Sequence, residues 1–269
     1  MALLSGTIAA TAQSDTTLSS EKIDTSFFEQ QLQNVSSQFL GRRYRLSPLG
    51  EEKGIDKDPL IRFDVFDCTT YIETVIALAH TPHRARQDQI EMLNSIRYND
   101  PTPDYQVRRH LPEFQWLPEL IEQGILRDIT REIAPNRVRT LSTTMSPSIW
   151  KRRKRRIVPH LPTNAVPDLD IEIPYIPTDS FNQAAKEIDE IAVLSIVRVK
   201  SNRIPVVITH QALFIPNNGY PVVRHATKKP YYRVIEESLP LFLARLKRQR
   251  KRPVLVLNVT DILPPTRHH

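Results

Sequence analysis

The chain has 269 residues, a single cysteine, 22 prolines and only 6 glycines, and its formal net charge is +7. One cysteine excludes an internal disulfide, and the sequence holds neither a glycine-rich phosphate loop nor a dinucleotide-binding fingerprint. A content of 40% hydrophobic and 25% charged residues is typical of a globular protein with one large or two small domains. The positive charge favours an anionic partner or surface, and no segment approaches the roughly 20 apolar residues of a membrane helix.

The N-terminal residues contain a short apolar run that ends in Ala10-Thr11-Ala12. This A-x-A ending is typical of a signal-peptide cleavage site, although no Lys or Arg precedes the run. We therefore expect residues 1–25 to be a signal remnant or a disordered start. A signal remnant predicts an exported protein, either periplasmic or secreted.

The first predicted helix begins at Ser26, with Glu29 three residues later as in a capping box. Gly41 is expected to end it, because glycine tolerates the backbone conformation that follows a helix. Its apolar positions recur at helical spacing: Phe27, Phe28, Leu32, Val35 and Phe39.

The second predicted helix begins at Cys68, directly after Asp67, which is a good N-cap residue. Thr70 and Glu73 add a second capping pattern at the same end. Its apolar positions also follow helical spacing: Ile72, Val75, Ile76 and Ala79. The sequence therefore predicts that Cys68 lies in the first turn of a helix whose far face is buried.

Later segments change from helical to extended periodicity, and the Asn217-Asn218-Gly219 run is a strong hairpin signal. Further helices are predicted over 82–94, 117–123 and 239–246, with one more turn over 128–132. Strands are predicted over 96–98, 138–144, 169–173, 192–199, 204–215, 220–226 and 254–259. This order predicts an α+β fold in which N-terminal helices, including the cysteine helix, pack on a C-terminal antiparallel sheet.

Cys68 is the first candidate for chemistry. The unpaired N–H groups and the positive end of the helix dipole favour a thiolate, which is the reactive form of cysteine. The alternative is a buried apolar cysteine, which a lone cysteine commonly is.

His210 and His225 lie at similar distances on either side of the predicted hairpin turn, so they are expected to be near neighbours across it. A cysteine nucleophile needs a base, usually histidine, and a third polar group to orient that base. Two alternatives remain: ordinary sheet histidines, or a metal site with Cys68 as third ligand, for which no clustered ligand spacing is present.

Four segments, in this order, resemble the NlpC/P60-like cysteine peptidases. They are Phe39-Leu40-Gly41-Arg42-Arg43-Tyr44, Phe66-Asp67-Cys68-Thr69-Thr70-Tyr71-Ile72-Glu73, Thr209-His210-Gln211-Ala212-Leu213-Phe214 and Arg224-His225-Ala226. More narrowly, the chain resembles the DUF1460 family, described as N-acetylmuramoyl-L-alanine amidase-like. Weaker matches lie at Ile96-Arg97-Tyr98, Arg109-His110 and Asp128-Ile129-Thr130.

The resemblance implies a papain-like catalytic domain over 26–269 that hydrolyses an amide bond in the peptide part of bacterial cell wall. It implies Cys68 as nucleophile, His210 as base and His225 as third polar group, with no metal or organic cofactor. The substrate-binding or supporting residues that it implies are Tyr44, Asp67, Arg97, Tyr98 and His110. The chain departs from the family pattern at two places. Ala212 stands where the family has a glycine, and Ile188-Asp189-Glu190 stands where it has a Gly-Asp turn. Both departures affect the expected shape of the substrate cleft.

A basic run of six residues, Lys151-Arg152-Arg153-Lys154-Arg155-Arg156, lies in a proline-rich insertion expected over about 145–180. It predicts a contact with anionic envelope polymers if the protein is exported, and the alternative is a solvated, mobile arm before the sheet. A nucleic-acid-binding protein is a further alternative, but no stacking platform or groove-binding motif accompanies the run. Another alternative is a protein of the same fold that binds wall fragments without cutting them.

Overall fold

The computed structural model describes residues 17–153, 158, 160–198, 206–217, 219–248 and 254–265. The helices are α1 Thr17–Gln38, α2 Cys68–His80, α3 Arg86–Arg97, α4 Leu117–Glu122, α5 Pro147–Arg153, α6 Thr178–Ala184 and α7 Leu239–Lys247. The strands are β1 Arg43–Tyr44, β2 Val65–Phe66, β3 Leu126–Asp128, β4 Arg139–Met145, β5 Leu169–Pro177, β6 Ala192–Arg198, β7 Ile208–Ile215, β8 Val222–Thr227, β9 Arg233–Ser238 and β10 Val254–Ile262.

The ten strands form one mixed sheet, in the order β2-β1-β9-β8-β7-β6-β10-β5-β4, with β3 paired to β10. The predicted α+β class is confirmed, but the sheet is not wholly antiparallel, because β1 pairs with β2 in parallel. The N-terminal half is also not purely helical, since it contributes β1, β2 and β3. Strands of two or three residues are too short to show a periodicity in sequence.

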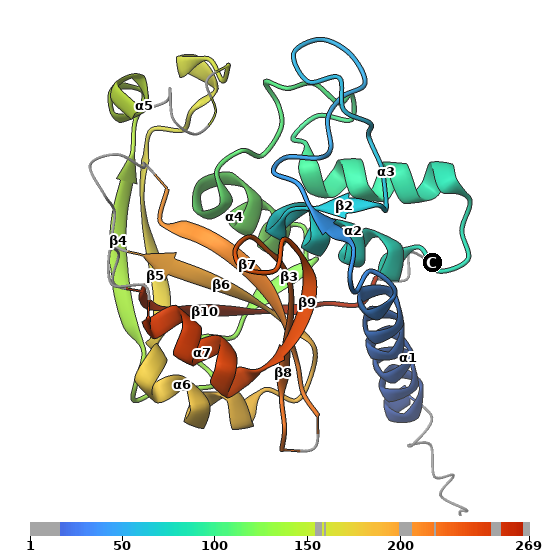
Figure 1. The fold of residues 1–269 in the computed structure, drawn as a ribbon, viewed down its shortest axis with the longest axis vertical. Helices are drawn as coiled ribbons and strands as arrows, with labels where there is room; N and C mark the ends of the chain where they lie inside the picture. The colour runs from blue at the N-terminus through green and yellow to red at the C-terminus, as the bar shows by residue number, and fades with distance from the viewer. Residues whose placement is uncertain are drawn as a thin grey trace, which may run out of the picture.

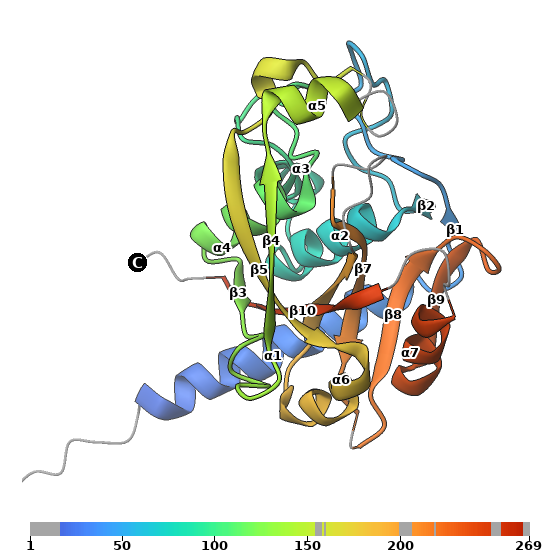
Figure 2. The same ribbon diagram turned by 90° about the vertical axis from the view of Figure 1, so that its left-hand side faces the viewer.

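Helices cover both faces of this sheet (Figures 1 and 2), with α1, α2 and α3 on one side and α6 and α7 on the other. Alternate residues of β7 belong to different cores, as the two-residue period of a strand requires. Leu213 and Ile215 pack with α2, whereas Ala212 and Phe214 pack with α7. The predicted packing of the cysteine helix on the sheet is therefore observed.

Several expected boundaries differ from the structure. The first helix starts at Thr17 rather than Ser26, so part of the predicted loose start is helical. Residues 17–25 contain no proline or glycine, so a helix anchored by packing further on can extend through them. Residues 1–16 lie outside the described residues.

The predicted strand at 96–98 is the end of α3 and its cap, and Tyr98 makes only an isolated bridge with Arg108. The turn predicted over 128–132 is entered from a strand, because Leu126–Asp128 pairs with the end of β10. The turn itself is present, since the N–H of Glu132 donates to the carbonyl of Ile129 at 3.0 Å. At 96–98 the helix continues through Arg97, and three residues are too few to show a strand period.

The predicted insertion over 145–180 is partly integral to the fold. β5 pairs with both β4 and β10, so it is a strand of the main sheet. Trp150 in α5 is fully buried, and its indole Nε1 donates to the carbonyl of Leu161 at 3.3 Å. The described part of the basic run, Lys151 to Arg153, therefore continues a helix that is anchored by a buried tryptophan.

A buried polar network ties the cysteine helix to the neighbouring loop and to α3. Glu73 of α2 forms an ion pair with Arg97 at 3.2 Å, and both side chains are almost completely buried. Arg97 also donates to the carbonyl of Leu49 at 3.1 Å. Tyr98 donates to the carboxylate of Glu51 at 2.9 Å, and Glu51 accepts a further bond from Arg108 at 2.8 Å.

Arg97→Ala is expected to lower the free energy of unfolding by about 3–5 kcal/mol, because it leaves the Glu73 carboxylate buried without its partner. Urea denaturation followed by circular dichroism measures this change. Arg131→Ala, at an exposed position, serves as the control and is expected to change stability by less than about 0.5 kcal/mol. A loss below about 1 kcal/mol in Arg97→Ala would show that the pair is not a structural anchor.

Candidate active site

Cys68 is the first residue of α2, as predicted, and the helix start is tightly capped. The Asp67 carboxylate accepts from the backbone N–H of Thr70 at 2.8 Å, and the Thr70 hydroxyl accepts from the Asp67 N–H at 3.0 Å. A second Asp67 oxygen accepts from the N–H of Ser47 at 2.8 Å, which fixes the loop before the helix. The capping pattern predicted for Thr70 and Glu73 is replaced by this one, because Glu73 is buried one turn further on with Arg97.

The start of α2 lies where two strands of the sheet separate. β7 and β8 pair only near their hairpin, from Ile215 back to Leu213, whereas β8 continues to pair with β9 beyond that point. Thr69, next to the nucleophile candidate, donates its hydroxyl to the side-chain oxygen of Gln211 in β7 at 2.9 Å. The structure therefore places the first turn of α2 beside Gln211. Among the described residues no hydrogen bond joins the Cys68 thiol to His210, which precedes Gln211 on the same strand.

His210 and His225 are brought together as predicted. His210 Nε2 and His225 Nδ1 are 2.7 Å apart, and the two rings meet edge to face with centroids 4.9 Å apart. His210 is half-buried at the start of its strand, whereas His225 is fully buried. His225 also packs against Phe242 of α7, with ring centroids 5.5 Å apart.

Two further side chains extend this pair. Glu237 of β9 lies with its carboxylate 3.0 Å from His225 Nε2, and the guanidinium of Arg245 in α7 donates to the same carboxylate. The Arg245 guanidinium is also 3.2 Å from His225 Nε2. Sequence reasoning missed both residues. The segment of β9 was not predicted as a strand, and α7 was predicted as a helix whose residues were given no function.

The protonation state that the structure favours for Cys68 differs from the predicted thiolate. Burial raises the pKa of Cys68 to about 11, the Asp67 charge adds to this rise, and the N–H of Gln211 opposes it. Burial also lowers the pKa of His210 and of His225. At neutral pH the resting thiol and both imidazoles are therefore uncharged, because desolvation outweighs the helix dipole.

This pKa direction gives a measurable expectation for Cys68. Iodoacetamide reacts with the thiolate, and a thiol with a pKa near 11 is ionised only to about one part in 10,000 at pH 7. The alkylation rate is expected to rise about tenfold for each pH unit between pH 7 and pH 10. Intact-protein mass spectrometry over time measures this rate. A rate that reaches its plateau below pH 8 would show a preformed thiolate instead.

Tyr44 and Asp67 lie at the site, as the resemblance implied. Tyr44 pairs with Phe66, two residues before Cys68, in the parallel contact of β1 and β2. Burial raises the pKa of Tyr44, and negative charge on an ionised Cys68 and on Asp67 adds to the rise, so the phenol stays protonated at neutral pH. The ammonium of Lys228 lies 5.5 Å from the centre of the Tyr44 ring.

Arg97, Tyr98 and His110 occupy supporting positions rather than the surface of the site. Arg97 and Tyr98 are buried in the polar network described above. His110 is half-buried, its Nε2 lies 2.7 Å from the carbonyl of Tyr105, and burial lowers its pKa to about 4. These contacts do not bring the three residues to the first turn of α2.

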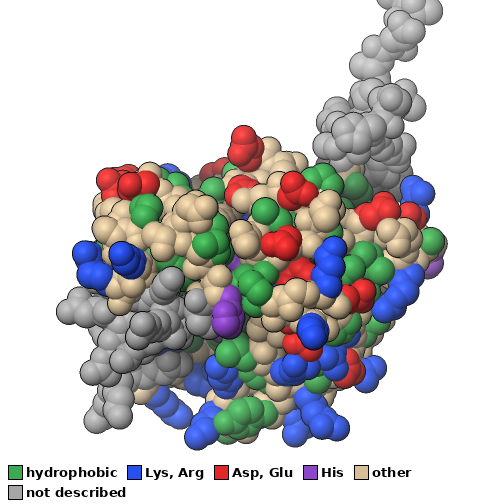
Figure 3. Space-filling model, turned by 90° about the horizontal axis from the view of Figure 1, so that it is seen from above, with side chains coloured by type: hydrophobic (Ala, Val, Ile, Leu, Met, Phe, Trp, Pro, Cys, Tyr) green, Lys and Arg blue, Asp and Glu red, His purple; other side chains and the backbone are tan. Residues whose placement is uncertain are grey.

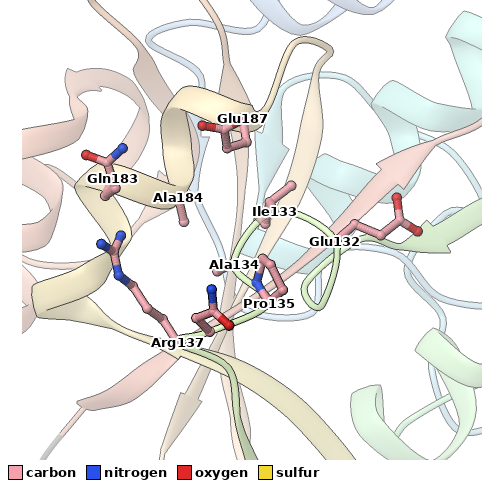
Figure 4. Close-up of a pocket in the computed structure, with 9 residues that line it drawn as sticks. Glu132, Ile133, Ala134, Pro135, Arg137, Gln183, Ala184 and Glu187 are labelled. Carbon is pink, nitrogen blue, oxygen red and sulfur yellow. The ribbon is translucent and has the colours of Figure 1, made fainter.

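The hollow shown in Figure 4 is separate from these histidines. It lies between the loop of residues 132–137 and α6, and Arg137 extends toward Gln183 across it. Within the part of the chain that the structure describes, no three His, Cys, Asp or Glu side chains are grouped as a metal site would require.

Solved structures of several proteins have a fold similar to this one. A Legionella pneumophila protein of the DUF1460 family has a TM-score of 0.74 and 22% identity, over 93% of this chain and 97% of that one. A Bacteroides uniformis N-acetylmuramoyl-L-alanine amidase has a TM-score of 0.65 and 19% identity, over 87% and 98%. A Bacteroides fragilis protein described as a candidate xylanase has a TM-score of 0.64 and 20% identity, over 85% and 100%.

At such identities these likenesses show a shared fold, and their different names show that the fold alone does not decide the chemistry. No protein with a curated description matches the chain. Residues 34–248 match the profile of the N-acetylmuramoyl-L-alanine amidase-like family, and this match covers most of the chain. The protein therefore belongs to the N-acetylmuramoyl-L-alanine amidase-like family.

Proposed function

We propose that this protein is a cysteine hydrolase that cleaves an amide bond in the peptide portion of bacterial peptidoglycan. Membership of an amidase-like family supports hydrolysis of a wall amide, either the N-acetylmuramoyl-L-alanine bond or a bond within the peptide. The observation that carries the proposal is the 2.7 Å contact of His210 with His225, on a strand whose next residue contacts the first turn of α2.

The same arrangement supports placement in the papain-like NlpC/P60 superfamily. A nucleophile at the start of a helix that packs on a sheet carrying the base is the arrangement which that resemblance implies. Here Cys68 opens α2, and His210 lies on β7, which α2 contacts.

The first chemical step is acylation of Cys68. His210 Nδ1 is the ring nitrogen not engaged with His225, so it takes the thiol proton as the sulfur attacks the amide carbonyl. A bond forms between Sγ and the carbonyl carbon, and the electron pair of the C=O bond moves to oxygen. When the C–N bond breaks, His210 gives its proton to the leaving amine, and a thioester remains.

The second step is hydrolysis of that thioester. Water gives one proton to His210 while its oxygen attacks the carbonyl carbon, and the proton then returns to the sulfur as the acid is released. His225 holds the imidazole of His210 in one orientation and tautomer throughout, as the third group of such triads does.

The developing oxyanion needs hydrogen-bond donors at the start of α2. The N–H groups of Thr70 and Tyr71 already bind Asp67, so we assign this role to the N–H of Cys68. The protonated phenol of Tyr44 is the second donor that we propose.

Incubation of the protein with muropeptides, followed by mass analysis of the products, tests this function. The proposal expects two products that together exceed the substrate by the mass of one water. They are a sugar and a peptide if the N-acetylmuramoyl-L-alanine bond is cut, or a sugar that keeps part of the peptide and a shorter fragment if a bond within the peptide is cut. Unchanged muropeptides would favour the alternative, a protein that binds wall fragments or anionic polymers without cutting them. The raised pKa of Cys68 is the observation on which that alternative rests.

We further propose that the basic run from Lys151 to Arg156 contacts anionic envelope polymers. Lys151 and Arg152 are exposed, and residues 154–156 lie outside the described residues. Figure 3 shows that Lys and Arg side chains gather along the lower rim of the face seen from above. Replacement of the run with Gln is expected to weaken salt-sensitive binding to wall fragments.

Export to the periplasm or outside the cell stays a proposal that rests on the apolar run ending at Ala12. In the part of the chain that the structure describes, none of the helices has the length and apolar character of a membrane span. Mass analysis of the N-terminus of protein recovered from the cell envelope tests whether the run is removed.

A further inference from the structure

The row of contacting side chains that starts at His210 continues beyond His225. Glu237 follows it across the β8–β9 ladder, in which His225 pairs with Ile235, so Glu237 points to the same face two residues further on. The Glu237 side chain is 10% exposed and that of Arg245 is 25% exposed, whereas that of His225 has no exposure. A carboxylate in this position is shielded from water and is held by two cationic or donor groups.

The contacts fix where the protons lie. Glu237 is acceptor-only when ionised, and its pKa is held below the usual range, burial being opposed by the bonds from His225 and Arg245. Its approach to His225 Nε2 at 3.0 Å therefore requires a proton on that nitrogen. Nδ1 of the neutral His225 ring is then an acceptor, and it takes the proton of His210 Nε2. The remaining nitrogen, His210 Nδ1, is left unprotonated.

We propose that Glu237 is a positioning residue that sets the tautomers of His225 and His210, with Arg245 holding its carboxylate. This inference rests on the proposed function, because it explains how His210 presents a basic nitrogen. When His210 takes up a proton, the Glu237 charge also stabilises the cation through His225. Arg245 acts on the carboxylate alone, since a guanidinium cannot accept a bond from His225 Nε2.

The charged groups around the two imidazoles indicate how loss of the Glu237 charge changes the basicity of His210. Arg245 from α7 and Arg198 from β6 both disfavour a protonated His210. Glu237 from β9 opposes Arg245 at the neighbouring ring, because its carboxylate raises the pKa of His225. Without the Glu237 charge, His210 becomes a weaker base.

Glu237→Gln keeps the shape of the side chain and removes its charge. We expect kcat to fall by about 10- to 100-fold with KM within about twofold, as for the loss of an outer partner of a functional histidine. We also expect the acid limb of the rate against pH to move to lower pH, because the pKa of His210 falls. A side chain that only supported the fold would lower activity without moving this limb.

Glu236→Gln is the matched control. Glu236 is the preceding residue of β9, and it pairs with Arg224, away from the histidines. Its replacement is expected to leave kcat and the acid limb within about twofold and 0.2 pH units of the unaltered protein. Thermal unfolding of both variants shows whether either has lost its fold.

Nitrogen-15 NMR of the histidine rings tests the same proposal without any substrate. His210 and His225 are assigned by comparison with His210→Gln and His225→Gln, and both are expected to carry their proton on Nε2. A proton on Nδ1 of His225 overturns the proposal, as does a Glu237→Gln protein with unaltered kcat and acid limb. If muropeptides are not cut at all, the proposed function fails, and the NMR result still decides the role of Glu237.

Discussion

Cys68→Ala is expected to lower muropeptide hydrolysis by about 10,000-fold or more, which is the scale seen when the nucleophile of a triad is removed. No other cysteine exists in the chain to replace it. The side chain is small and half-buried at the tip of α2, so the fold is expected to survive with a change in unfolding temperature of a few degrees. Product masses and a thermal melt measure the two effects.

Cys68→Ser is the closest control for shape. A serine fills almost the same space but is a far weaker nucleophile than a thiol, so it is also expected to be inactive. Hydrolysis by either variant at more than about 1% of the unaltered rate would exclude the thioester mechanism.

His210→Gln is expected to have the second largest effect, a loss of about 1,000- to 10,000-fold in kcat. The resting thiol is neutral, so attack without a base depends on the very small thiolate fraction of a group with a pKa near 11. The loss is therefore expected to shrink as the pH is raised toward 10. Steady-state kinetics between pH 6 and pH 10 measure this trend.

His160→Gln is the control for that experiment, because His160 is exposed and contacts Tyr105 rather than the site. It is expected to leave kcat within about twofold of the unaltered value. A His210→Gln protein that matches this control at pH 7 would remove His210 from the mechanism.

The nucleophile helix could be predicted because its signals are local. Asp67 caps it, and Ile72, Val75 and Ile76 repeat on one buried face, so a few consecutive residues specify both its start and its packing. The hairpin that carries the two histidines could also be predicted, because the Asn-Gly turn defines which residues lie near each other across it.

The rest of the site depends on contacts between distant segments. Glu237 meets His225 only because β9 pairs with β8, and β9, with the sequence Arg-Val-Ile-Glu-Glu-Ser, shows little apolar alternation. The raised pKa of Cys68 was missed for the same reason. The helix start is visible in the sequence, whereas the burial that raises the pKa arises from packing against β7.

The resemblance identified Arg97 and Tyr98 without separating a substrate contact from a structural one. The structure buries both, with Arg97 paired to Glu73 on the nucleophile helix itself. Replacing either residue is therefore expected to change the stability of the fold and the position of α2. For this reason Arg97→Ala is tested by unfolding rather than by kinetics.

Alkylation of the single cysteine tests the central claim most directly. The protein is treated with iodoacetamide at pH 9 for increasing times, and the alkylated fraction and the rate of muropeptide hydrolysis are measured on the same samples. The account predicts that hydrolysis falls in proportion to the unalkylated fraction of Cys68 and that bound muropeptides slow the alkylation. Fully alkylated protein that still hydrolyses muropeptides at the original rate would contradict it.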